Sequence, residues 1–108
     1  MSNQIIPKSF QVLGHKYRIS YKNDLGYNDG CLGRINFSTK DIHLQPFKDS
    51  YPVAPTEVEQ TYCHELVHLI LKESHEDCYD PPLHSREALV DRIASVLHQI
   101  LKTSKYEK

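Results

Sequence analysis

The sequence lacks an excess of charge of either sign and lacks any long apolar run. Its 108 residues include 13 Lys and Arg and 14 Asp and Glu, which gives a net charge of −1 and a sequence pI near 6.6. This balance carries no overall signature of a nucleic-acid-binding protein, although it leaves room for a local basic patch. The longest uninterrupted apolar stretch, residues 69–71, is far too short to cross a bilayer. We therefore expect neither a nucleic-acid partner nor a membrane partner.

Cysteine is scarce as well. Cys31, Cys63 and Cys78 form an odd set with no spacing typical of metal ligands, so we interpret them as thiols in a reducing compartment. Residues 1–10 contain a lysine and a proline where a secretory signal peptide would need an apolar run. Hydrophobic residues at 39% and charged residues at 25% are typical of a globular protein. We expect a cytoplasmic protein with a single domain over residues 1–108, present as a monomer.

The hydrophobic pattern predicts an α+β fold, with a small antiparallel or mixed sheet of two hairpins packed on two helices. Alternating apolar and polar residues indicate a first hairpin over residues 10–21, with a two-residue turn at Gly14 and His15. A second hairpin follows over residues 35–44, with apolar residues at alternate positions of both arms. The strands together span residues 9–45, and the prolines after them predict an irregular segment before the first helix.

At Thr56 the hydrophobic period changes to that of a helix. Thr56 followed by Glu59 matches a capping box, which predicts a helix over residues 56–74. Its apolar residues cover roughly 220° of the helix circumference, so we expect most of this helix to be buried. A second apolar stripe predicts another helix over residues 82–102.

The first predicted helix contains an H-E-x-x-H motif, from His64 through Glu65 to His68. Residues four apart share a helix face, with Cβ atoms about 5–6 Å apart, so two imidazoles can converge on one Zn²⁺ at roughly 2.0–2.1 Å. Glu65 lies about 100° around the helix from His64, too far round to be a ligand. It is well placed to act as a general base on a metal-bound water.

A catalytic zinc site needs a third protein ligand. The H-E-x-x-H-x-x-G-x-x-H type would have Gly at position 71 and His at position 74, but the sequence has Leu71 and Ser74 there. His75 comes one residue late for that pattern. This histidine is therefore a poor candidate for the third ligand.

A carboxylate on the second predicted helix is a better candidate. Glu87 and Asp91 lie one turn apart on one helix face. Glu87 can bind the metal while Asp91 accepts the free N–H of a ligand imidazole, which fixes the tautomer and direction of the ring. The alternative is that the two residues form a solvated acidic edge among neighbouring arginines.

These residues resemble the gluzincin pattern, in which H-E-x-x-H is followed by E-x-x-x-D, as in thermolysin-like enzymes. The small size, a predicted strand over residues 41–45 before the motif, and E-A-x-x-D-x-I-A over residues 87–94 are most similar to ImmA/IrrE-type metallopeptidases. Compact members of that group are common in bacteria and phages. The resemblance covers about residues 33–101. Val67 departs from it, because many relatives have Gly at that position.

The resemblance implies a minimal zincin core with one Zn²⁺ per chain. His64, His68 and Glu87 would bind the zinc, Glu65 would be the general base and Asp91 would orient His64. It also implies that the strand before the motif forms the rim of a cleft and pairs with an extended peptide. The residues of that substrate strand would be Ile42, His43 and Leu44.

We therefore expect a zinc endopeptidase that hydrolyses peptide bonds of protein substrates by metal-activated water. The transition-state oxyanion needs a further hydrogen-bond donor. The candidates for it are Tyr79, His75, His84 and His43. An alternative is a catalytically weak or inactive zinc-binding module that recognises a phage or host regulatory protein, and a third is a structural domain without zinc. The expected location is the cytoplasm of a bacterial cell or of a phage-infected host.

Overall fold

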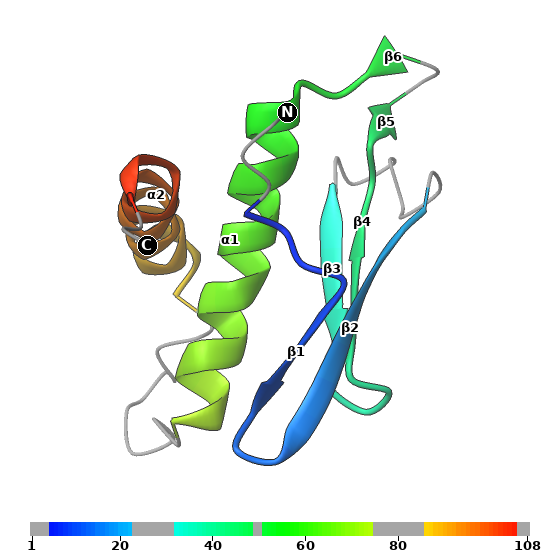
Figure 1. Ribbon diagram of the computed structural model, residues 1–108, viewed down its shortest axis with the longest axis vertical. Helices are drawn as coiled ribbons and strands as arrows, with labels where there is room; N and C mark the ends of the chain where they lie inside the picture. The colour runs from blue at the N-terminus through cyan, green and yellow to red at the C-terminus, as the bar shows by residue number, and fades with distance from the viewer. Residues whose placement is uncertain (1–4, 23–31, 49–50, 75–85, 106–108) are drawn as a thin grey trace.

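The structure, a computed structural model, describes residues 5–22, 32–48, 51–74 and 86–105. Its elements in chain order are β1 (Ser9–Val12), β2 (His15–Tyr21), β3 (Gly33–Asn36), β4 (Asp41–Leu44), β5 (Phe47–Lys48), β6 (Tyr51–Pro52), α1 (Pro55–Glu73) and α2 (Glu87–Thr103). Figure 1 shows three layers, with the sheet on one side of α1 and α2 on the other. The predicted α+β class, a small sheet packed with two helices, is confirmed.

The four-stranded sheet is mixed and has the strand order β1-β2-β4-β3. β1–β2 and β3–β4 are antiparallel hairpins, whereas β2 and β4 run parallel and join the two hairpins. In the first hairpin Val12 faces His15, so the two-residue turn is Leu13-Gly14, one residue earlier than predicted. Both turn residues have positive φ, 49° and 83°, as a type I′ turn requires, and Gly14 adopts such a φ at no steric cost.

The second hairpin turns through residues 37–40. The side-chain oxygen of Asn36 accepts hydrogen bonds from the backbone N–H groups of Ser38 and Thr39, at 2.9 and 3.1 Å. The segment that the prolines predicted to be irregular contains a short antiparallel pair, β5 with β6. Pro52 fits there because it ends a two-residue strand at the edge of this small sheet, where a missing N–H is tolerated.

β4 is a central strand of the four-stranded sheet, with Ile42 and Leu44 fully buried. The prediction that Ile42, His43 and Leu44 form the open rim of a cleft is therefore wrong, because β2 and β3 occupy both edges of β4. The edge strand of this sheet beside α1 is β3. The order of the strands along the chain does not reveal the parallel pairing that inserts β4 between β2 and β3.

α1 begins at Pro55, whose fixed φ suits the first position of a helix. The predicted capping box of Thr56 and Glu59 does not form, since no side chain caps this end of the helix. Glu59 reaches α2 instead. Its carboxylate lies 2.9 Å from Nε2 of His98 and accepts a hydrogen bond from Nζ of Lys102 at 3.3 Å. A local capping motif has thus been displaced by a contact between helices.

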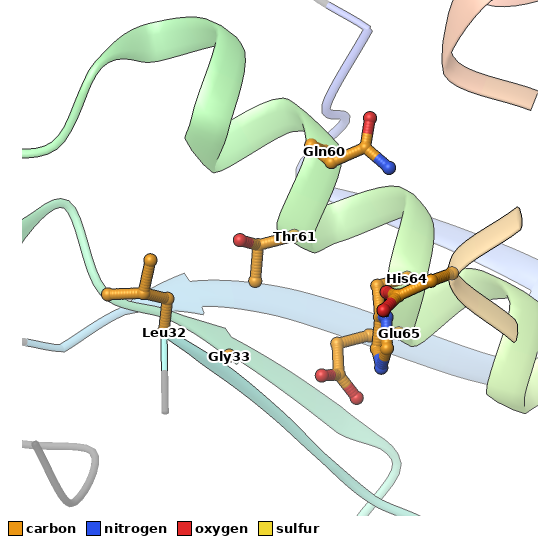
Figure 2. Close-up of a pocket in the computed structure, with 7 residues that line it drawn as sticks. Leu32, Gly33, Gln60, Thr61, His64 and Glu65 are labelled. Atoms are coloured by element: carbon orange, nitrogen blue, oxygen red, sulfur yellow. The ribbon is translucent and has the colours of Figure 1, made fainter. Parts of the chain in front are cut away.

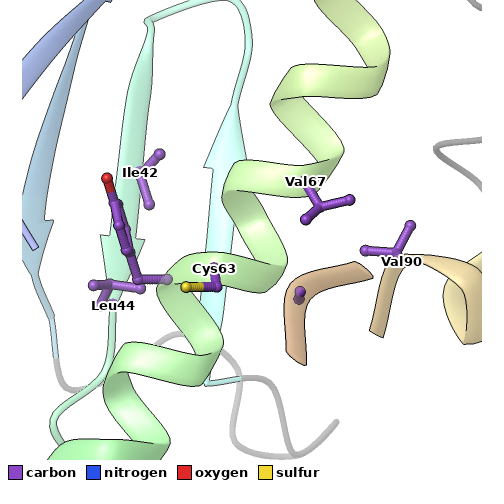
Figure 3. Packing of buried hydrophobic residues seen from close by; sticks show 7 residues of the cluster. Ile42, Leu44, Cys63, Val67 and Val90 are labelled. Carbon is purple, nitrogen blue, oxygen red and sulfur yellow. The ribbon is translucent and has the colours of Figure 1, made fainter. Parts of the chain in front are cut away.

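The hydrophobic core is formed by the sheet and both helices, as Figure 3 shows. Its buried residues are Ile42, Leu44, Tyr62, Cys63, Val67, Val90 and Ala94. α1 lies between the other two layers, which explains its wide apolar arc, although Ile70, in the last turns of the helix, is 46% exposed. Cys63 is a fully buried core residue, and its burial raises the pKa of the thiol to about 11.

α2 packs on α1 through Val90 and Ala94, which are fully buried. It ends at Thr103, one residue beyond the prediction, while the predicted start at residue 82 lies outside the described residues. In the part of the chain that the structure describes, neither helix has the length and apolar character needed to span a membrane.

The buried contact of Glu59 with α2 makes a pH-dependent contribution to stability. Burial by itself would raise the pKa of Glu59, but the hydrogen bonds from His98 and Lys102 outweigh it and hold the pKa below its ordinary value of 4.5. A carboxylate with a lowered folded-state pKa stabilises the fold above its unfolded-state pKa. This contribution is lost as the pH falls through the folded-state pKa.

Glu59→Gln is expected to lower the unfolding free energy by about 1.5–3 kcal/mol at neutral pH, because it removes a charged acceptor that two side chains share. The unfolding free energies of the two proteins should converge as the pH falls below about 4.5. Urea unfolding at a series of pH values measures this. The exposed Glu57 on the same helix gives the matched control, Glu57→Gln, which should change little at any pH. A loss that persists undiminished in acid would contradict the assignment.

Candidate metal centre

His64 and His68 lie one turn apart on the same face of α1. Their Nε2 atoms are 3.2 Å apart, and the two rings meet edge to face with centroids 4.9 Å apart. Both side chains are largely buried, with 22% and 15% of their surface exposed. The helical spacing thus brings the two imidazoles together as the motif predicted.

The third member of the group is Glu87, the first residue of α2. One carboxylate oxygen lies 3.1 Å from Nε2 of His64, and the other lies 3.3 Å from Nε2 of His68. The three residues each offer one ligand atom, and these atoms all lie within 4.8 Å of one another. Two imidazole nitrogens and a carboxylate are the donor types that divalent transition metals prefer, so this group could hold a metal ion.

Asp91 lies one turn further along α2 and contacts the opposite side of the His64 ring. Its Oδ1 is 2.7 Å from Nδ1 of His64, so the carboxylate accepts the hydrogen of that nitrogen. This bond leaves Nε2 of His64 directed at His68 and Glu87. It fixes the tautomer and the direction of the ring, which is the geometry that the sequence predicted for Asp91.

Glu65 follows His64 and lines the same pocket, with its carboxylate directed toward β3 (Figure 2). Its side chain is buried, with 8% of the residue exposed. Burial is the main cause that raises the pKa of the Glu65 carboxyl to about 7. The charge of Glu87 raises it further, whereas His64 and Arg34 act in the opposite direction. A carboxyl with such a pKa can both accept and release a proton near neutral pH.

A pocket of about 320 Å³ opens beside Glu65, between α1, α2 and the start of β3. It is lined by Leu32, Gly33, Gln60, Thr61, His64, Glu65 and Asp91 (Figure 2). Gln60 and Thr61 were not predicted as lining residues. The signal was present, because Gln60 precedes His64 by four residues, as His64 precedes His68, and therefore lies on the same helix face.

Gly33 allows β3 to approach α1 closely at this pocket. A Cβ atom at this position would clash with Cγ2 of Thr61 and would lie 3.4 Å from a methyl of Leu44 and 3.5 Å from Cγ of Glu65. Any side chain here would therefore push β3 away from the carboxylate. The close approach of Gly33 to α1 depends on the tertiary fold, so no local pattern of the sequence indicates it.

Of the predicted hydrogen-bond donors for the transition state, His43 lies in the described part of the chain, and it does not join the ligand group. His43 lies on the face of the sheet that points away from α1, because its neighbours Ile42 and Leu44 are buried against the helix. Its Nδ1 is 3.0 Å from the hydroxyl of Ser20. The prediction of His43 as a transition-state donor is therefore wrong. The remaining candidates lie outside the described residues: Tyr79, His75 and His84.

The centre thus combines three converging ligand atoms, a carboxylate that orients one imidazole, and a buried carboxyl beside a pocket. Such an arrangement can bind a metal ion and can hold or release a proton next to it. Comparison of this chain with protein-family models, with curated proteins and with solved structures found no match.

Proposed function

We propose that the protein is a zinc-dependent endopeptidase. The observation that carries this proposal is the convergence of ligand atoms from His64, His68 and Glu87. The two Nε2 atoms are 3.2 Å apart, and Glu87 places one carboxylate oxygen 3.1 Å from Nε2 of His64 and the other 3.3 Å from Nε2 of His68. Ligands held at about 2.0–2.1 Å around a tetrahedral zinc ion are separated by about 3.3–3.4 Å, close to these separations. Two histidines and a glutamate, with the fourth position open, form a ligand set of catalytic rather than structural zinc sites.

Zinc bound there would lower the pKa of a water molecule and polarise the carbonyl of the scissile bond. Glu65 supplies the proton transfer, because its carboxylate lies at the pocket between α1 and β3, beside the ligand group. It takes the proton of the attacking water and delivers it to the leaving amine. Asp91 keeps the ring of His64 in the orientation that presents Nε2.

β3 is the strand that we expect to bind the substrate, in place of β4. The hydrogen bond from Gln45 N–H to the Leu32 carbonyl makes these two residues a hydrogen-bonded pair of the antiparallel ladder. Bonded and non-bonded pairs alternate, so Ile35, which faces Ile42, directs its own N–H and C=O away from β4. An extended peptide that pairs with Ile35 would run along the edge of the sheet beside the pocket.

The test is cleavage of an unfolded protein substrate by the zinc-loaded protein and by Glu65→Gln. Removal of the general base should lower kcat/KM by about 100–10,000-fold while the zinc content stays at one ion per chain. Glu57→Gln, an exposed change on the same helix, should leave kcat/KM unchanged. If the unaltered protein retains zinc but cleaves the substrate no faster than Glu65→Gln does, the hydrolase proposal fails. The alternative, a zinc-binding module that recognises a regulatory protein, then takes its place.

A further inference from the structure

The balanced net charge hides an uneven distribution of charge along the chain. In residues 5–22 and 32–47, which include the four-stranded sheet, the acidic residue is Asp41. The cationic residues of the same ranges are Lys8, Lys16, Arg18, Lys22, Arg34 and Lys40. Acidic side chains are concentrated in the helical half instead, where several of them build the metal centre. A sheet this basic, in a chain with a net charge of −1, creates a strong local field.

Three of these cations gather on one face of the sheet. Tyr17 in β2 and Ile42 in β4 are fully buried on the side of α1, so alternation directs the residues between them to the opposite face. We call the cations of β2 and of the residue after it the cationic sheet face: Lys16, Arg18 and Lys22, all exposed. Figure 1 shows that α1 and α2 lie on the other side of the sheet. This face thus remains accessible among the described elements.

Asp41 does not neutralise this face. Its carboxylate lies 3.7 Å from Nε of Arg18, whose side chain is 71% exposed, so the pair is long and solvated. The hydroxyl of Ser20 and Nδ1 of His43 are hydrogen-bonded to each other on this face. Ser20 lies between Arg18 and Lys22 in the sequence, so neither of these cations takes part in that bond. Among the described residues, the net charge of this face is therefore positive.

We propose that the cationic sheet face binds an extended acidic segment of a partner protein. Lys16 and Arg18 lie at alternate positions of β2, and Lys22 directly follows the strand, with Ser20 between the last two cations. Alternate residues of a strand are about 6.6–6.8 Å apart. An extended peptide has the same spacing between alternate side chains, so a segment with Asp or Glu at every second position can place a carboxylate opposite each of these cations.

A single-stranded nucleic acid fits this face less well. Proteins that bind such strands on a sheet combine cations with aromatic rings on which the bases stack. The aromatic rings of this sheet belong to Phe10, Tyr17 and Tyr21. Phe10 and Tyr17 stack on each other with centroids 5.7 Å apart, on the side of α1. Tyr21 is 53% exposed, but alternation along β2 puts it on the same side of the sheet as Tyr17. The described part of the cationic sheet face therefore supplies charge without a stacking surface. The proposal is independent of the metal centre.

Binding of a labelled peptide of alternating Glu and Ser tests the proposal, in the Glu65→Gln background so that the probe is not cleaved. Lys16→Glu/Lys22→Glu should weaken binding by about tenfold at low salt. Arg92→Glu/Lys105→Glu is the matched control, because it changes the net charge equally at exposed positions of α2 and the residues after it. The affinity of the control variant for the peptide should stay within about twofold of that of the parent protein. Added salt should weaken the binding of the parent protein.

Three results would overturn the proposal. The first is an equal loss in both double variants, which would mean diffuse attraction by net charge. The second is tighter binding of an oligothymidylate of the same charge, which would point to nucleic acid. The third is equal affinity for the peptide and for its Gln analogue. If circular dichroism shows that Lys16→Glu/Lys22→Glu does not fold, Lys16→Gln/Lys22→Gln replaces it, with an expected loss of about threefold.

Discussion

His68→Ala is expected to abolish stoichiometric metal binding, with an affinity at least about 1000-fold lower than that of the unaltered protein. The change removes one of three ligand atoms and leaves only His64 and Glu87. Loss of a partner that merely orients a ligand typically costs about 10–100-fold in affinity, so loss of a ligand should cost more. Asp91→Asn, which weakens the bond to Nδ1 of His64 without removing a ligand, should fall in that smaller range.

Competition with a chromophoric chelator measures these affinities. His98→Ala is the matched control, since it removes a histidine of α2 that bonds Glu59 rather than the ligand group. The affinity of His98→Ala for zinc should change by no more than about tenfold. This is the smallest loss that is typical when a residue that supports a ligand is replaced. Zinc binding by His68→Ala as tight as in this control would contradict the assignment of the centre.

Ile42→Ala is expected to lower the unfolding free energy by about 2–5 kcal/mol, a large part of the stability of a small domain. Ile42 is fully buried in the central strand β4 and belongs to the core formed by the sheet and both helices. Truncation removes apolar contacts and leaves a cavity in close-packed surroundings. Urea denaturation gives the free energy, with a lower midpoint and an unchanged slope.

Ile35→Ala provides the comparison for this prediction. Ile35 faces Ile42 directly across the ladder but is only partly buried in the edge strand β3, so its loss should be clearly smaller. The comparison of these two variants also distinguishes the role of β4 as a core strand from the proposed role of β3 as the substrate strand. Should Ile42→Ala leave stability unchanged and impair peptide binding, β4 would be the substrate strand after all.

The candidate site was largely predictable because its main constraints are local. The four-residue spacing of His64 and His68 sets their common helix face in any α-helix, and the same holds for Glu87 and Asp91. Local spacing does not predict that the two helices approach each other, and it is this approach that brings Glu87 to the histidines. The sequence offered Glu87 as a candidate ligand, with a solvated acidic edge as the alternative, and the resemblance to gluzincins implied that the two helices approach each other.

The errors arose where distant segments meet. β4 alternates buried Ile42 with the more exposed His43 because one face of the sheet is covered and the other is open, and an edge strand would give the same pattern. Glu59 fitted a capping box by sequence, but its bonds to His98 and Lys102 across the helix pair determine its position. The clash that Gly33 avoids with Thr61 is likewise a property of the folded chain.

The position of α2 as an outer layer divides the centre between two layers. The main contacts of α2 are with α1, so its position depends on the packing of these two helices and not on the hydrogen bonds of the sheet. Glu87 and Asp91 belong to this outer layer, whereas His64, His68 and Glu65 belong to the helix that packs on the sheet. Any substitution that changes the packing between α1 and α2 is therefore expected to alter the geometry of the third ligand before that of the two imidazoles.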